Sequence, residues 1–164
     1  MEKRNDFTIT RVLNASREMV FKAFTDPKHL AHWWGPKGCT LSVAKIELKP
    51  GGTFLYCMEL PGGHSMWGKF VYLEIKAPEK IIFINSFSDK EGNIIRHPMA
   101  PTWPLEVYNV WTLIEQNGKT TLTLSGHPHN ASDEENKTFY DSVHMMQDGF
   151  KGTFDNLEEY LVKM

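Results

Sequence analysis

Residues 132–161 read SDEENKTFYDSVHMMQDGFKGTFDNLEEYL, and this stretch decides what the rest of the chain must fold around. Ser132 followed by Glu135 forms a capping box, which is typical of a helix N-terminus. The large apolar residues after it recur at spacings of three and four, as on the buried face of a helix. We therefore expect one long helix over residues 132–162. Its apolar face consists of Phe139, Val143, Met146, Phe150, Phe154, Leu157 and Leu161.

Before this helix, the chain consists mainly of short apolar segments separated by turn residues, which is the pattern of an antiparallel sheet. Two stretches, REMVFKAFT (17–25) and PKHLAHWW (27–34), have helical spacing instead, and Gly35-Pro36 should end the second. The order β-α-α-β-β-β-β-β-β-α predicts an α+β fold, in which a curved six- or seven-stranded sheet wraps around the long helix. Strands are expected at 6–14, 40–49, 52–60, 64–75, 81–87, 105–116 and 119–127.

Length and charge limit the classes of function. The chain has 164 residues, which fits a single domain spanning 1–164. Its net charge is −2 and it has no basic run, so the electrostatic footprint of a nucleic-acid-binding protein is missing. No apolar run approaches the ~20 residues needed to span a membrane. Residues 1–10 lack the apolar centre of a signal peptide, so a cytoplasmic location is expected.

Five segments resemble one protein family, in the family's order and over nearly the whole chain. They are FTDPKHLAHWWGPKG (24–38), LKPGGTF (48–54), YLEIKAPEKIIF (72–83), DKEGN (89–93) and GFKGTFDNLEEYL (149–161). The chain resembles the START-like, or helix-grip, superfamily (SRPBCC). Within it, the chain resembles the branch named after the C-terminal domain of the activator of the ninety-kilodalton heat-shock chaperone's ATPase. Phe150 stands where this branch is expected to have Trp, but it keeps the bulk. The resemblance implies a hollow between the sheet and the long helix that takes a hydrophobic ligand.

The pair Trp33-Trp34, in HWWGPKG (32–38), lies where the second short helix must end. In this family the two short helices form a V that supports the end of the long helix. The resemblance therefore implies that one indole lies in the core and the other at the cavity entrance. The sequence leaves open which tryptophan takes which place.

Aromatic and methionine side chains are numerous on the segments that would surround such a hollow, and they suit a flat or apolar ligand. The alternative is a closed core that these side chains fill. The candidate cavity residues are Trp33, Trp34, Tyr56, Met58, Met66, Trp67, Phe83, Tyr108, Trp111, Phe139, Met145, Met146 and Phe150. The candidate polar residues of the cavity are His64, Asn85, Asn109 and His144.

Histidines are the residues to weigh for metal binding or acid–base chemistry. His29 and His32 stand three apart on one face of a helix, and His127 and His129 flank a proline. Neither pair has a cysteine or acidic partner at a diagnostic spacing, so we expect no metal site and no cofactor. Nucleophile, phosphate-loop and dinucleotide motifs do not occur either, and we therefore predict no catalytic residue.

Three functions fit these expectations. The first is a small cytoplasmic binding protein for a hydrophobic or aromatic molecule that the sequence does not identify. The second is an enzyme of the polyketide cyclase or dehydratase type, which shares this fold and would need an inward acid or base such as His64 or His144. The third is a co-chaperone module. Because the chain has no room for the N-terminal domain of the activator, we expect no stimulation of the chaperone's ATPase.

Both cysteines should carry free thiols. KPGGT (49–53) has the composition of a hairpin turn and would pair Cys57 with position 44 or 45, so Cys39 would lie ~16 Å further along its strand. A disulfide requires Cα atoms within about 7 Å. Alkylation of the unfolded, unreduced protein should therefore modify Cys39 and Cys57. An intact mass lower by two hydrogens and resistant to alkylation would contradict this.

Overall fold

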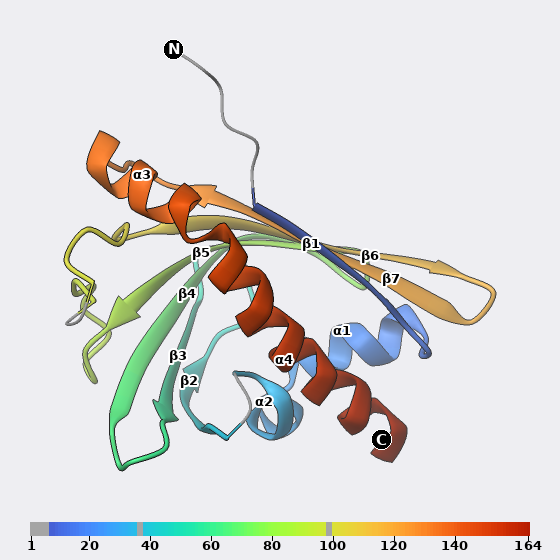
Figure 1. Ribbon diagram of the computed structural model, residues 1–164. Helices are drawn as coiled ribbons and strands as arrows, with labels where there is room; N and C mark the ends of the chain where they lie inside the picture. Colours follow the sequence, from blue (N-terminus) through green and yellow to red (C-terminus); the bar gives the residue numbers. More distant parts are fainter. Residues whose placement is uncertain (1–6, 36–37, 98–99) are drawn as a thin grey trace.

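A seven-stranded antiparallel sheet forms the body of the computed structural model, which describes residues 7–35, 38–97 and 100–164 (Figure 1). Every predicted strand is present. The order in the sheet is β1-β7-β6-β5-β4-β3-β2, so the chain runs back and forth from β2 to β7 and β1 pairs with β7. The strands are β1 (Phe7–Leu13), β2 (Thr40–Ile46), β3 (Thr53–Glu59), β4 (Ser65–Lys76), β5 (Lys80–Ser88), β6 (Val107–Gln116) and β7 (Lys119–Pro128).

One long helix crosses this sheet diagonally, and two short helices lie beneath its C-terminal end (Figure 1). Ser16 caps the first short helix by accepting the N–H of Met19 at 3.2 Å. The predicted helix-ending Pro36 lies outside the described residues. Within the described part of the chain, no helix is long and apolar enough to cross a membrane. The helices are α1 (Arg17–Thr25), α2 (Pro27–Trp33), α3 (Asp133–Asp141) and α4 (Val143–Lys163).

The prediction of a single helix over 132–162 is wrong in one respect, because the chain breaks it at Ser142 into α3 and α4. Ser142 has φ −99° and ψ 4°, and its hydroxyl donates to the carbonyl of Thr138 at 2.7 Å. Serine side chains compete in this way with the hydrogen bonds of a helical backbone. The predicted capping box at the start of α3 is present.

The V formed by α1 and α2 fills the space beneath the C-terminal half of α4. Phe24 of α1 stacks on Trp111 of β6, with ring centroids 3.9 Å apart. Trp33 of α2 is buried beside this pair, and its Nε1–H donates to the carbonyl of Ala23 at 2.8 Å. Phe154 of α4 is fully buried over Trp111, with centroids 5.8 Å apart. This half of the molecule is a closely packed core.

The two cysteines lie near one edge of the sheet. Cys39 comes just before β2, and Cys57 lies in β3. Cys57 pairs with Ser42, not with the residues predicted, because the hairpin turn sets a different register from the one expected and a bulge between Val43 and Lys45 shifts it by one further residue. Cys39 and Cys57 are both free among the residues that the structure describes. The prediction of free thiols is therefore confirmed, although the predicted pairing is wrong.

A glycine in β4 allows an aromatic ring to lie flat against the sheet. Gly68 pairs with Tyr56 of β3, and a Cβ built on Gly68 would collide with the Tyr56 ring. An aromatic side chain that covers a cross-strand glycine also helps to fix the register of a sheet. In this position the Tyr56 hydroxyl reaches Asn85 of β5, on the far side of β4.

Two glycine-to-alanine substitutions should have opposite effects on stability. Gly68→Ala should lower the free energy of unfolding by about 1–3 kcal/mol, because the buried Tyr56 ring must move to admit the methyl group. Gly149→Ala should raise it by up to about 1 kcal/mol, since this helical glycine has open space around its Cβ position. Urea unfolding of the two variants and the wild type measures both changes. Equal stabilities for the two variants would contradict this account of the sheet.

Candidate functional site

Beyond the core, the inward-facing side chains of α4 are less completely buried in its N-terminal half than in its C-terminal half. Met146 and Phe150 are only half-buried, whereas Phe154 and Leu157 are fully buried. A Cβ built on Gly149 would meet no atom within 4 Å. Two hollows lie on either side of this part of the helix, and we name them by the neighbouring helices.

The α3-side hollow has a volume of about 150 Å³ and lies between α4, the loop before β6 and strands β5 to β7. Trp103 of that loop and Phe139 of α3 cover it, with ring centroids 5.6 Å apart. Its lining is mostly aromatic, with two asparagines on the sheet. The lining residues are Phe7, Asn85, Ser86, Phe87, Trp103, Pro104, Val107, Asn109, Gly126, Phe139, Met146 and Phe150.

The α2-side hollow has a volume of about 220 Å³ and lies between α4, the end of α2 and strand β3. Aromatic rings and thioethers again form most of its wall, and it opens more widely to solvent than the α3-side hollow. The lining residues are Trp34, Gly35, Tyr56, Met58, Met146, Gly149, Phe150 and Thr153.

Met146 and Phe150 border both hollows, so these two side chains form the partition between them. Each hollow alone is smaller than the roughly 300 Å³ at which ligand pockets usually begin. Methionine is unbranched and has three rotatable side-chain bonds, so a movement of Met146 can join the hollows into one site. Among the described residues, no Lys, Arg, His, Asp or Glu lines either hollow.

A small group of hydrogen bonds links the walls of the two hollows. The Trp34 indole N–H donates to the Tyr56 hydroxyl, which is also hydrogen-bonded to the side chain of Asn85. Asn85 Nδ2 donates in addition to the carbonyl of Lys69 at 3.2 Å. Burial raises the pKa of Tyr56, and the two side-chain hydrogen bonds offset only part of this effect. The phenol therefore stays protonated and uncharged at neutral pH.

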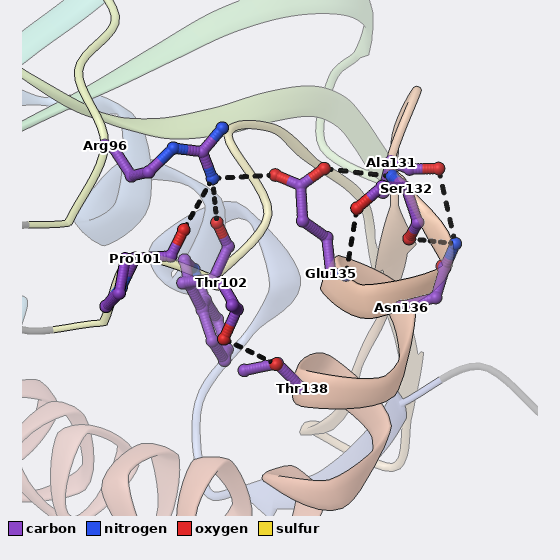
Figure 2. A network of polar contacts seen from close by, with 9 residues as sticks. Arg96, Pro101, Thr102, Ala131, Ser132, Glu135, Asn136 and Thr138 are labelled. Carbon is purple, nitrogen blue, oxygen red and sulfur yellow. Dashed lines mark hydrogen bonds and ion pairs between the residues drawn. The ribbon is translucent and has the colours of Figure 1, made fainter.

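Hydrogen bonds join α3 to the loop before β6, as Figure 2 shows, and both segments contribute lining residues to the α3-side hollow. Arg96 Nη1 donates to Glu135 Oε2 and to the carbonyl of Pro101, both at 2.9 Å. Thr138 Oγ1 donates to Thr102 Oγ1 at 2.8 Å. These bonds hold the roof of the hollow in place, because the loop and α3 each carry one of the aromatic rings that cover it.

The structure separates the roles of the two adjacent tryptophans. Trp33 lies in the core, with its indole N–H bonded to a carbonyl of α1. Trp34 is half-buried, borders the α2-side hollow and donates its indole N–H to Tyr56. Trp33 therefore helps to pack the core beneath α4, and Trp34 forms part of the wall of the α2-side hollow.

Only some of the other candidate cavity residues border a hollow. Phe83 and Trp111 lie in the core, where Phe83 stacks on Phe70 with centroids 4.1 Å apart. Met66 pairs with Met58 across β3 and β4 but borders neither hollow. The candidates that do border a hollow are Trp34, Tyr56, Met58, Asn85, Asn109, Phe139, Met146 and Phe150.

Trp67 and Tyr108 were expected to line a cavity, but they lie on the outer face of the sheet. Side chains alternate along a strand, and Gly68 and Asn109 face inward, so their neighbours Trp67 and Tyr108 face outward. Tyr108 stacks there on His127, with ring centroids 5.0 Å apart.

The candidate acid–base residues also lie outside both hollows. His64 is exposed in the turn between β3 and β4, and His144 is exposed on α4. Met145, the residue beside the partition, is 73% exposed. The expectation that these residues face a cavity is corrected, because the inward face of α4 is occupied by Met146 and Phe150.

Several lining residues were missed by the sequence analysis. Phe87 and Val107 lie two positions from Asn85 and Asn109 on the same strands, so strand alternation would have placed them on the same face. Trp103 lies in a loop without periodicity, and no sequence signal indicates where it points. The missed residues are Phe7, Gly35, Ser86, Phe87, Trp103, Pro104, Val107, Gly126, Gly149 and Thr153.

The histidine pair of α2 contacts a tyrosine of α4. His29 Nδ1 lies 2.6 Å from the Tyr160 hydroxyl, and the His32 ring stacks on the Tyr160 ring with centroids 5.1 Å apart. These contacts join α2 to α4 at the closely packed end of the molecule. The described ranges contain no group of three or more His, Cys, Asp or Glu residues that could hold a metal ion.

Comparisons with known proteins agree with this architecture. A family model described as Activator of Hsp90 ATPase homolog 1-like protein matches residues 14–162. No curated protein sequence matches the chain. Protein Ms6760 from Mycobacterium smegmatis is 26% identical with a TM-score of 0.75, over 93% of this chain and 87% of that one.

Two solution structures share the fold at lower sequence identity. A protein from Arthrobacter aurescens is 22% identical with a TM-score of 0.80, over 97% of this chain and 87% of that one. A protein from Staphylococcus epidermidis is 22% identical with a TM-score of 0.77, over 99% of this chain and 93% of that one.

The ionic contact in the roof should stabilise the protein only when Glu135 is charged. Hydrogen bonds from the Ser132 backbone and the Arg96 guanidinium lower the pKa of Glu135 from its ordinary value of 4.5. A lowered folded-state pKa gives stability that is present above the ordinary value and is lost as pH falls through the folded value. Glu135→Gln keeps a capping-box acceptor but removes the charge.

Urea unfolding should therefore show Glu135→Gln to be less stable than the wild type at neutral pH by up to about 1 kcal/mol, since the Arg96 side chain is partly exposed. This difference should disappear in acid, where the wild-type carboxyl is protonated. Glu134→Gln, an exposed change in the same helical turn, is the matched control. A Glu135→Gln deficit that persists in acid would show that the charge is not its cause.

Proposed function

This chain belongs to the Activator of Hsp90 ATPase homolog 1-like family, and we propose that it binds a small hydrophobic or aromatic molecule between its sheet and α4. The sheet curved around α4 is the START-like helix-grip fold. In the proposed complex the ligand lies in the two hollows beside Met146 and Phe150.

One observation carries this proposal. The same apolar face of α4 is closely packed at its C-terminal end and only half-buried around Met146 and Phe150, where two hollows meet. Both hollows open to solvent and are lined mostly by apolar side chains, and a concave apolar surface that is left exposed commonly marks a ligand-binding groove. Walls of aromatic rings and methionines suit a flat apolar ligand and adapt to its shape.

The cyclase or dehydratase alternative has less support. Such an enzyme needs an acid or base within hydrogen-bond reach of its substrate. His64 and His144 are exposed outside the hollows. The titratable side chain that does border them is Tyr56, whose pKa is raised by burial. No observation on the described residues favours a chaperone-binding role, and the absence of ATPase stimulation stays a prediction.

Filling the partition should remove the site. Met146→Trp places a larger side chain where the two hollows meet, so binding of the uncharged fluorescent probe Nile red should fall sharply relative to the wild type. Because the added ring fills empty space, the free energy of unfolding should stay level or rise by up to about 2 kcal/mol. Probe titration and thermal unfolding of both proteins measure the two effects.

The neighbouring methionine supplies a matched control. Met145 is 73% exposed on the same helix, so Met145→Trp should leave probe binding near the wild-type level. If the wild type binds little probe and Met146→Trp costs about 1–3 kcal/mol of stability, the region is an overpacked core and the proposal fails.

A further inference from the structure

The walls of the two hollows offer hydrogen bonds but no charge. Among the described lining residues, the polar side chains are two asparagines, a tyrosine, a tryptophan and small hydroxyls. None of them is charged at neutral pH, because the ordinary pKa of a tyrosine is already about 10 and burial raises the pKa of Tyr56 further. A buried carboxylate or ammonium group would have no opposite charge here, and an unpaired buried charge is strongly unfavourable.

The hydrogen-bonding groups are gathered in one place. Trp34 and Tyr56 border the α2-side hollow, Asn85 borders the α3-side hollow, and the three side chains are joined by hydrogen bonds. An indole N–H is a donor, whereas a phenol hydroxyl and an amide can each donate and accept. This cluster can therefore bond to a hydroxyl or carbonyl group of a ligand whichever role that group takes.

The partition between the hollows is apolar, in contrast to the hydrogen-bonding cluster. Met146 of α4 has a soft thioether, and Phe150 of α4 presents a ring that lies 5.8 Å from the Phe7 ring. Both side chains are half-buried and favour a flat apolar surface over a polar one. One molecule that spans both hollows would thus meet apolar contacts on the helix side and neutral hydrogen-bonding groups on the sheet side.

We infer that the site selects an uncharged, flat aromatic molecule that carries a hydroxyl or amide group. The polar group bonds to Tyr56 and Asn85, and the ring lies against Met146 and Phe150. This inference rests on the proposed function and adds to it the charge of the ligand and the position of its polar end. Aromatic acids and amines of the same size are excluded because the site offers them no counter-charge.

Three ligands of equal ring size test the selection at neutral pH. 2-Naphthol is uncharged, 2-naphthoate is an anion and 2-naphthylmethylamine is a cation. Each is titrated against the wild-type protein carrying Nile red, and the fall in probe fluorescence gives its affinity. 2-Naphthol should bind at least about tenfold more tightly than either ion, because each ion must give up its hydration without a charged partner.

The possible results distinguish this inference from the proposed function. If the wild type binds Nile red and binds 2-naphthol and either ion with equal affinity, the site does not select uncharged ligands, but the proposed hydrophobic site still stands. Failure of the wild type to bind Nile red overturns both. Displacement by 2-naphthol alone supports both.

A single change of charge tests the position of the polar end. Asn85→Asp puts a carboxyl group of almost the same shape beside Tyr56, and burial should raise the pKa of this carboxyl, so the variant is measured at about pH 8, where it is ionised. There it should weaken the binding of 2-naphthoate further and strengthen the binding of 2-naphthylmethylamine by at least about tenfold. Asn117→Asp makes the same change in the exposed β6–β7 turn and should alter none of the affinities. If Asn85→Asp folds and leaves the order of the three ligands unchanged, the polar end does not lie at Asn85. Titration of the three ligands against the wild-type protein still tests the selection of uncharged ligands if this variant does not fold.

Discussion

The stack of Phe24 on Trp111 is the contact on which the rest of the molecule depends. It fixes α1 against the sheet, and Trp33 of α2 then fills the remaining space beside it. The packing of these rings is favourable enough to bury the indole N–H of Trp111, which finds no acceptor among the described residues, at a cost of about 1–3 kcal/mol. The height of the resulting V sets how far the C-terminal half of α4 stands from the sheet.

The hollows follow from this geometry. The V formed by α1 and α2 fills the space under the C-terminal half of α4, and it ends where Trp34 begins. Beyond that point Met146 and Phe150 are the side chains that reach toward the strands, and they are too few to fill the space. The neutral hydrogen bonds of Tyr56, Trp34 and Asn85 then satisfy the polar groups of the sheet without introducing charge. Support of the helix and the presence of the two hollows are thus two results of the same packing.

Most of the fold could be predicted from local sequence patterns, because the strand and helix periods are strong and the capping residues are explicit. The break at Ser142 could not, since one serine within a strong helical pattern does not signal a break. The site was harder to predict. Alternation along β4 and β6 would have placed Trp67 and Tyr108 outside, had the inward faces been assigned from Phe70 and Trp111. Trp33 and Trp34 both pack against Phe24, and which of them enters the core depends on tertiary contacts that no local pattern contains.

The uneven support of α4 has a consequence for how the protein moves. Cooperative opening of a native structure begins where few apolar contacts would be lost, and the turns that follow Ser142 are such a place. One continuous helix therefore contains amides of very different protection, rising from its first turns to those around Leu157. Fraying of these few helical turns would widen the more enclosed α3-side hollow, and the free energy of that opening is set locally, independently of global unfolding. Sequence changes in these first turns would act mainly on this local opening, whereas changes around Leu157 would act on the unfolding of the whole domain.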